Sequence, residues 1–173
     1  QSVEFLRNGA QLAICGETSD QKNPRIHGFV SIVDVADGNT VRHWELPGRA
    51  FGMGVSADAR FLAMASGSPP DAFLLDPNAK EVAPQIEIWD LKSNEMAHKL
   101  TSFTADFNSH ISFSRDSKSI YFLSNNGLTV WNRDREKPTL LPDATWLQDQ
   151  YVTKPRQRIS QLATEYDGDR GYM

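Results

Sequence analysis

The sequence predicts an all-β fold built from short antiparallel strands. Three observations indicate it. Apolar residues alternate with a period of two, turn-forming residues separate the apolar runs, and no stretch before residue 140 shows the apolar stripe of a helix. The chain has 173 residues, of which 39% are hydrophobic and 23% charged, as is ordinary for a globular domain. The period alone is compatible with a sandwich, a barrel or a propeller.

Pairs of neighbouring apolar runs predict hairpins along the chain. Each pair flanks three or four residues that include Asp, Asn or Ser, which favour tight turns. The expected strand pairs are 29–35 with 40–46, 51–56 with 61–66, 86–91 with 96–100, 110–114 with 119–124, and 119–124 with 128–132.

An internal repeat favours the propeller. The run 55–66 aligns with 113–124, and each copy is followed by a strand that ends in tryptophan. A weaker first copy begins near residue 5, so the repeat starts are separated by about 50 and then 58 residues. The matching residues in the two better copies are Asp58 with Asp116, Ser66 with Ser124, and Trp89 with Trp131.

This pattern resembles the WD-repeat β-propeller family over roughly residues 3 to 132. The resemblance implies a partial β-propeller of four-stranded antiparallel blades. It also implies a hydrogen-bonded tetrad in each blade, made of a turn Asp, a strand Ser or Thr, a Trp and a His. The residues that would take part are Asp58, Ser66 and Trp89 in one blade and Asp116, Ser124 and Trp131 in the next.

The repeats are degenerate. The positions expected to hold the His carry Leu46 and Thr104, and the first copy has Asn8 and Val33 in place of Asp and Trp. We therefore expect packing of the blades to hold them together, with the apolar strands 30–35, 86–91 and 111–113 as the inner layer. Asp58 and Asp116 fall in hairpin turns, where a short carboxylate can accept backbone N–H bonds.

The repeats divide the chain into about three blades over residues 1–132 and a C-terminal extension over 133–173. The extension is expected to be part of a further blade or a cap. Closed propellers have about four to eight blades, so the remaining blades would come from the same longer polypeptide or from another chain. The first residue is Gln1 rather than Met, which favours a piece of a longer polypeptide.

A long segment between two predicted strands is a candidate partner-binding loop. Residues 67–85 contain four prolines, which discourage a further strand, and an apolar cluster of Phe73, Leu74 and Leu75. Trp146 lies between two basic runs further along and is a second candidate contact. The alternative is that these apolar side chains pack onto their own blade.

The residue types used in catalysis and metal binding form no recognisable pattern in the sequence. The sequence has no Gly-x-Ser-x-Gly motif, and Cys15 sits in an apolar run typical of a buried thiol. Its four histidines are far apart and lack the spacing of metal ligands. We therefore predict no catalytic residue, no metal site and no cofactor.

Charge and hydropathy constrain the partners. A net charge of −4 argues against nucleic acid, and no window approaches the 18 or so apolar residues of a membrane span. One cysteine favours a reducing compartment, so the cytoplasm is expected, although a secreted or periplasmic protein could share this composition.

The function implied by the resemblance is a non-catalytic scaffold that binds a protein partner. Two alternatives remain open at this point. The chain could be the propeller domain of a larger enzyme such as a serine peptidase, or a ligand-binding sensor propeller of the periplasm or cell exterior.

Overall fold

The computed structural model describes residues 2–6, 9–20, 23–68, 82–101, 111–124, 127–135 and 139–140, and all its regular elements are strands. The predicted all-β class is therefore confirmed. Within the described ranges, no helix is long and apolar enough to cross a membrane. The strands are β1 (Ser2–Leu6), β2 (Gln11–Asp20), β3 (Asn23–Asp34), β4 (Thr40–Glu45), β5 (Arg49–Val55), β6 (Phe61–Gly67), β7 (Gln85–Asp90), β8 (Glu95–Leu100), β9 (Ile111–Phe113), β10 (Ser119–Ser124), β11 (Gly127–Asn132) and β12 (Thr139–Leu140).

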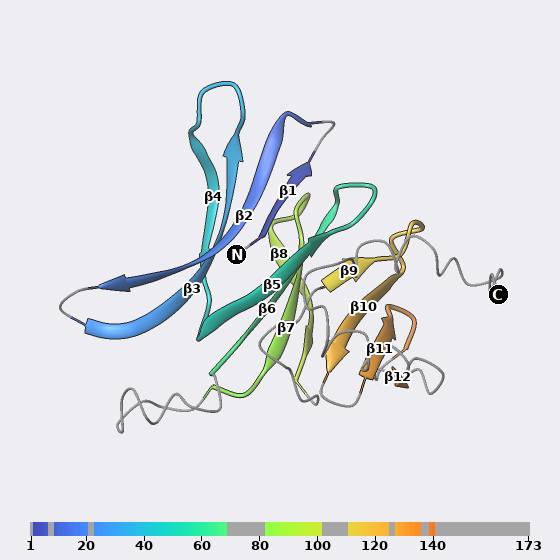
Figure 1. The fold of residues 1–173 in the computed structure, drawn as a ribbon. Helices are drawn as coiled ribbons and strands as arrows, with labels where there is room; N and C mark the ends of the chain where they lie inside the picture. The colour runs from blue at the N-terminus through green and yellow to red at the C-terminus, as the bar shows by residue number, and fades with distance from the viewer. Residues whose placement is uncertain are drawn as a thin grey trace, which may run out of the picture.

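The strands form three four-stranded sheets, each an antiparallel meander in chain order (Figure 1). The first sheet contains β1 to β4, the second β5 to β8 and the third β9 to β12. Every neighbouring pair within a sheet is antiparallel, and each predicted hairpin is present. The blades of the predicted propeller are these three sheets.

One predicted boundary is wrong. The expected blade region ends at residue 132, but β12 pairs with β11 through Thr139 and Leu140 and supplies the fourth strand of the third sheet. A strand of two residues is too short to show alternation, so the sequence pattern could not reveal it. The third blade therefore extends at least to Leu140.

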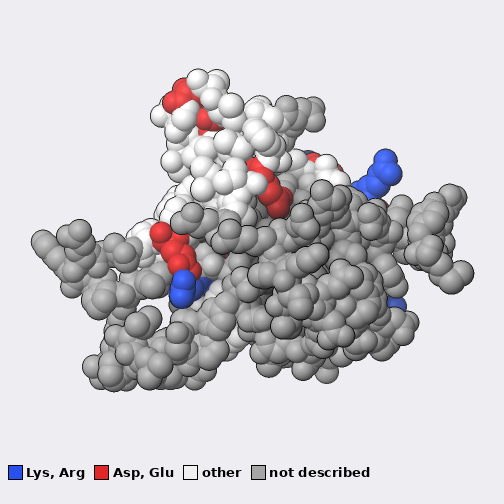
Figure 2. Space-filling model, viewed as in Figure 1, with Lys and Arg blue, Asp and Glu red and all other residues white. Residues whose placement is uncertain are grey.

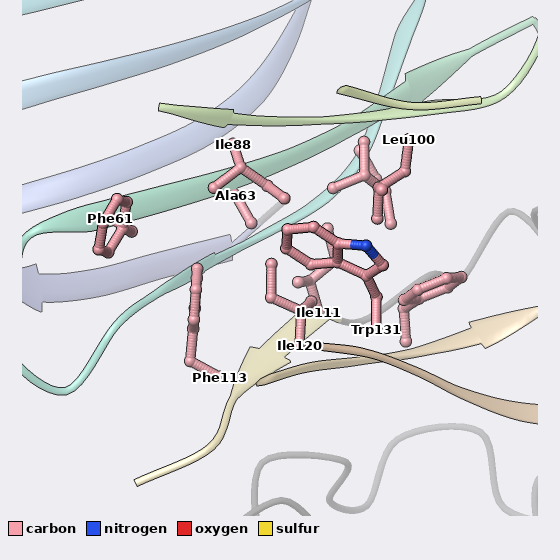
Figure 3. Close-up of a cluster of buried hydrophobic side chains, with 11 residues drawn as sticks. Phe61, Ala63, Ile88, Leu100, Ile111, Phe113, Ile120 and Trp131 are labelled. Carbon is pink, nitrogen blue, oxygen red and sulfur yellow. The ribbon is translucent and has the colours of Figure 1, made fainter. Parts of the chain in front are cut away.

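The second sheet lies between the other two. On the second sheet, we call the face that carries Leu62 and Met64 the front and the opposite face the back. The corresponding faces of the first and third sheets take the same names. The front of the second sheet packs on the back of the first in one apolar cluster. The back of the second sheet packs on the front of the third in another (Figure 3).

Strand β6 shows this arrangement most clearly because all seven of its residues are buried. Leu62 and Met64 belong to the cluster with the first sheet, whereas Phe61, Ala63 and Ala65 belong to the cluster with the third. Successive side chains on a strand point to opposite faces, so a strand covered on both faces is buried along its whole length.

The sheets converge at their first strands. A Cβ atom on Gly54 of β5 would lie 2.7 Å from the carbonyl oxygen of Ile111 in β9, closer than real Cβ contacts allow. Strand β5 also contacts β1. The strands predicted to form the core layer between blades do so: 30–35 contributes Val30 and Ile32 to one cluster, and 86–91 and 111–113 contribute Ile86, Ile88, Ile111 and Phe113 to the other.

Candidate functional site

The two turn aspartates of the predicted tetrads make local bonds. Asp58 lies between β5 and β6, and its Oδ1 accepts hydrogen bonds from Ser56 Oγ at 2.6 Å and from the Arg60 backbone N–H at 3.1 Å. Asp116 lies between β9 and β10 and accepts in the same way from Ser114 Oγ and from the Lys118 N–H at 3.0 Å. The prediction that these carboxylates accept backbone N–H bonds is confirmed.

The tetrads themselves are not assembled. Ser66 pairs with Gln85 at one end of the β6–β7 hairpin, whereas Trp89 pairs with Leu62, four positions away and about 13 Å along the strand. The Ser66 hydroxyl is buried without a hydrogen-bond partner among the described residues, and Trp89 Nε1 donates to Glu87 Oε2 at 3.2 Å.

The same correction applies to the third sheet. Ser124 pairs with Gly127 and Trp131 pairs with Ile120, so the two lie at opposite ends of the β10–β11 hairpin. Trp131 Nε1 is buried and has no hydrogen-bond partner in the described part of the chain. The antiparallel register separates the groups because Asp116 lies at the turn that precedes β10 and Ser124 at that strand's far end.

The two tryptophans instead contact the neighbouring sheet. Trp89, on the front of the second sheet, meets Trp44 of β4 with ring centroids 5.7 Å apart. Trp131, at the equivalent position of the third sheet, meets His98 of β8 edge-on at 4.9 Å (its place in the cluster is seen in Figure 3). Burial, with Arg133 nearby, lowers the pKa of His98. Each tryptophan therefore fixes its sheet against the fourth strand of the sheet before it.

Four turns at one end of the stack share a construction, and we call them together the turn rim: residues 34–39, 56–60, 90–94 and 114–118. The turns at 34–39, 56–60 and 114–118 lie on the upper side of Figure 1. In each turn an aspartate oxygen accepts the backbone N–H two residues further on, and the donors are Ala36, Asn39, Arg60, Lys92 and Lys118. Such side-chain bonds fix the turn conformation.

The backbone of the turn rim is also fixed by its dihedral angles. Ala59, Asn94 and Ser117 adopt positive φ of 53°, 59° and 60°, and Gly38 adopts 73°. Non-glycine residues occupy this region rarely, so the surrounding hydrogen bonds must hold them there. The turns of neighbouring sheets touch, since the Asp58 N–H lies 3.4 Å from Ser117 Oγ.

Charged groups add to the order of the turn rim. Arg60 donates to Asp90 Oδ2 from Nε at 2.9 Å and from Nη2 at 2.8 Å, which lowers the pKa of Asp90 and raises that of Arg60. The guanidinium groups of Arg60 and Arg133 lie 5.0 and 4.5 Å from the centre of the Phe61 ring. Arg133 belongs to the third sheet, so this contact also joins two sheets.

The predicted partner-binding residues Phe73, Leu74, Leu75 and Trp146 lie outside the described residues, so their roles stay predictions. In the described ranges, no group of three or more His, Cys, Asp or Glu side chains is placed to hold a metal ion. Cys15 is buried on the back of the first sheet, and this burial raises the pKa of its thiol.

Solved structures of low sequence identity resemble this chain in fold. Hydrazine synthase of Kuenenia stuttgartiensis matches with a TM-score of 0.55 at 15% identity, over 86% of this chain and 45% of that one. The Cps50 (Swd1) β-propeller domain of Myceliophteria thermophila matches with 0.55 at 14%, over 86% and 41%. The Dos1 propeller matches with 0.54 at 12%, over 78% and 32%.

These likenesses establish the fold. No protein-family model matches the sequence, and no curated protein is similar to it in sequence. The chain is a β-propeller fragment: three stacked four-stranded sheets that span less than half the length of each of the three propeller-containing chains.

Proposed function

We propose that this chain is part of a β-propeller that serves as a non-catalytic scaffold, and that the turn rim is the surface it offers to a protein partner. The observation that supports this most is the shared construction of the rim. Aspartates fix turns in all three sheets at the same end of the stack.

A fixed surface binds at lower entropic cost. Binding to a mobile loop carries the entropic cost of ordering that loop, whereas the turn rim is already ordered by its hydrogen bonds. Loops on a rigid scaffold are frequent binding sites for this reason. The rim also exposes charged side chains of both signs, among them Lys92, Arg115 and Asp116, which suits a polar protein surface.

The proposal places no reaction on this chain and assigns the protein to the cytoplasm. The cytoplasmic assignment is supported by the single cysteine, which is buried and makes no disulfide.

Site-specific photo-cross-linking in the native host would test the proposal. A photoreactive residue replaces Arg115 on the turn rim of the complete gene product, and in a matched control it replaces Lys99 of β8, an exposed position away from the turns. We expect a discrete cross-linked protein from the rim position alone. Equal cross-linking from positions 115 and 99 would contradict the proposal. So would the absence of a cross-linked protein both from position 115 and from position 92, tested in the same way.

One comparison favours a second candidate. Hydrazine synthase is an enzyme by its name, and the matched region is 45% of that chain. The present chain would then be a non-catalytic domain of a larger enzyme. The two candidates are distinguished by the rest of the gene product: a catalytic domain in the same polypeptide supports the enzyme, and further propeller sheets alone support the scaffold.

A further inference from the structure

The front of the first sheet is exposed to solvent, whereas the fronts of the second and third sheets are covered. Val3 and Phe5 of β1 are 60% and 68% exposed. The residues at the same register positions are Met53 and Val55 in the second sheet and Ile111 and Phe113 in the third. Met53, Ile111 and Phe113 are only 3%, 4% and 7% exposed, and Val55 is half-buried.

The rest of this face has the same apolar character. Leu12 pairs with Phe5 on one side and with Val33 on the other, and Ile14 pairs with Val3, so these side chains lie together on one face. Leu12 and Ile14 are half-buried, whereas their counterparts Leu62, Met64, Ile120 and Phe122 are completely buried. In Figure 2 the described surface at the top of the view, over the first sheet, is mostly uncharged.

The one polar pair on this face already has its hydrogen bond. Ser31 Oγ lies 2.8 Å from His43 Nδ1, and the imidazole stacks on Phe29 with ring centroids 5.8 Å apart. A buried polar group is costly only when it lacks a partner. The face can therefore be covered without leaving the Ser31 hydroxyl unpaired.

The two covered fronts show what kind of surface fits. Each is covered by the back of a sheet whose second strand carries small residues and whose third strand carries β-branched ones. In the first sheet these are Ala13, Cys15, Val30 and Ile32, and in the second Ala63, Ala65, Ile86 and Ile88. Small side chains on the back leave room for the larger ones of the front, so the two faces interdigitate.

We infer that the front of the first sheet docks the back of a further four-stranded sheet, supplied by the same polypeptide. A second copy of this chain fits less well, because the back of its third sheet carries Tyr121 where the covering backs carry Ala13 and Ala63. Tyr121 is moreover only 8% exposed in this chain. The three chains that match are each more than twice as long as the region matched.

This inference rests on the propeller part of the proposed function and not on the scaffold role of the turn rim. It is tested by thiol labelling of the complete gene product, carrying Val3→Cys or, as the control, Lys99→Cys at an exposed position of β8 away from the turn rim. Thiol reactivity depends on access, so we expect position 3 to react with a maleimide at least about tenfold more slowly than position 99. In the 173-residue chain alone, both positions should react at similar rates.

Two results would overturn the inference. The first is equal labelling of positions 3 and 99 in the complete product. The second is protection of position 3 in the isolated chain together with a dimeric mass by light scattering, which would make a second copy the occupant. Neither result bears on the turn rim, where cross-linking is the separate test.

Discussion

The first and second sheets have the same construction and different surroundings. Both are four-stranded meanders with tight polar turns at the same end. The second sheet is covered on both faces, and its strand β6 is buried throughout. The first sheet is covered only on its back, and Val3 and Phe5 on its front are exposed. The position of a sheet in the stack therefore decides how much its apolar side chains contribute to the stability of the fold.

The largest predicted effect compares two phenylalanines at one register position. In the isolated chain, Phe113→Ala should lower the free energy of unfolding by about 3–5 kcal/mol, because it leaves a cavity between the second and third sheets. Phe5→Ala should change it by no more than about 0.5 kcal/mol, as is usual for an exposed position. Urea unfolding of both variants measures the difference, and similar losses would show that Phe5 is covered in solution.

The next effect tests how closely the first strands approach. Gly54→Ala would place a methyl group 2.7 Å from the Ile111 carbonyl oxygen, and we expect a loss of about 1–3 kcal/mol from the forced shift of β9. Gly38→Ala is the control, because nothing lies within 4 Å of its Cβ position and only its φ of +73° opposes the change.

The control should lose about 1–2 kcal/mol, because a left-handed backbone opposes a side chain whatever the space around it. Thermal unfolding compares both glycine variants with the unchanged chain. If Gly54→Ala proves as stable as the unchanged chain, the close approach of β5 and β9 is not present in solution.

The smallest effect concerns the pH dependence of a turn. The hydrogen bonds from Ser114 and Lys118 hold the pKa of Asp116 below its ordinary value. A group with a lowered folded pKa stabilises the fold above its unfolded pKa, near 4, and loses that contribution as the pH falls through the folded value.

Asp116→Asn should therefore be less stable than the unchanged chain at pH 7, by at most about 1 kcal/mol because water screens this exposed group. The gap should close as the pH falls below about 4. Chemical unfolding at pH 7 and pH 3 measures it, and a gap that widens toward low pH would contradict the account.

Local patterns in the sequence predicted most of the fold. Alternating apolar residues located the strands, and Asp-containing turns located the hairpins, because both depend on neighbours in the chain. Strand β12 was missed because Thr139 and Leu140 are too few to alternate, and its place depends on pairing with β11.

The candidate site was predictable only in part. The alignment of 55–66 with 113–124 correctly placed Asp58 and Asp116 in turns, and their hydrogen bonds follow from that position. It could not show that Ser66 lies four register positions from Trp89, since that depends on the pairing of β6 with β7. The turn rim also required the structure, because only stacking brings the turns of three sheets to one end.

Amide hydrogen exchange in the isolated chain tests the central claim most directly, namely that the second sheet lies between the other two and the front of the first is open. We predict that the amides of Phe61–Gly67 in β6 exchange slowest, near the rate of global unfolding, and that those of Ser2–Leu6 in β1 exchange much faster. Equal protection of β1 and β6, or early exchange of β6, would contradict the account.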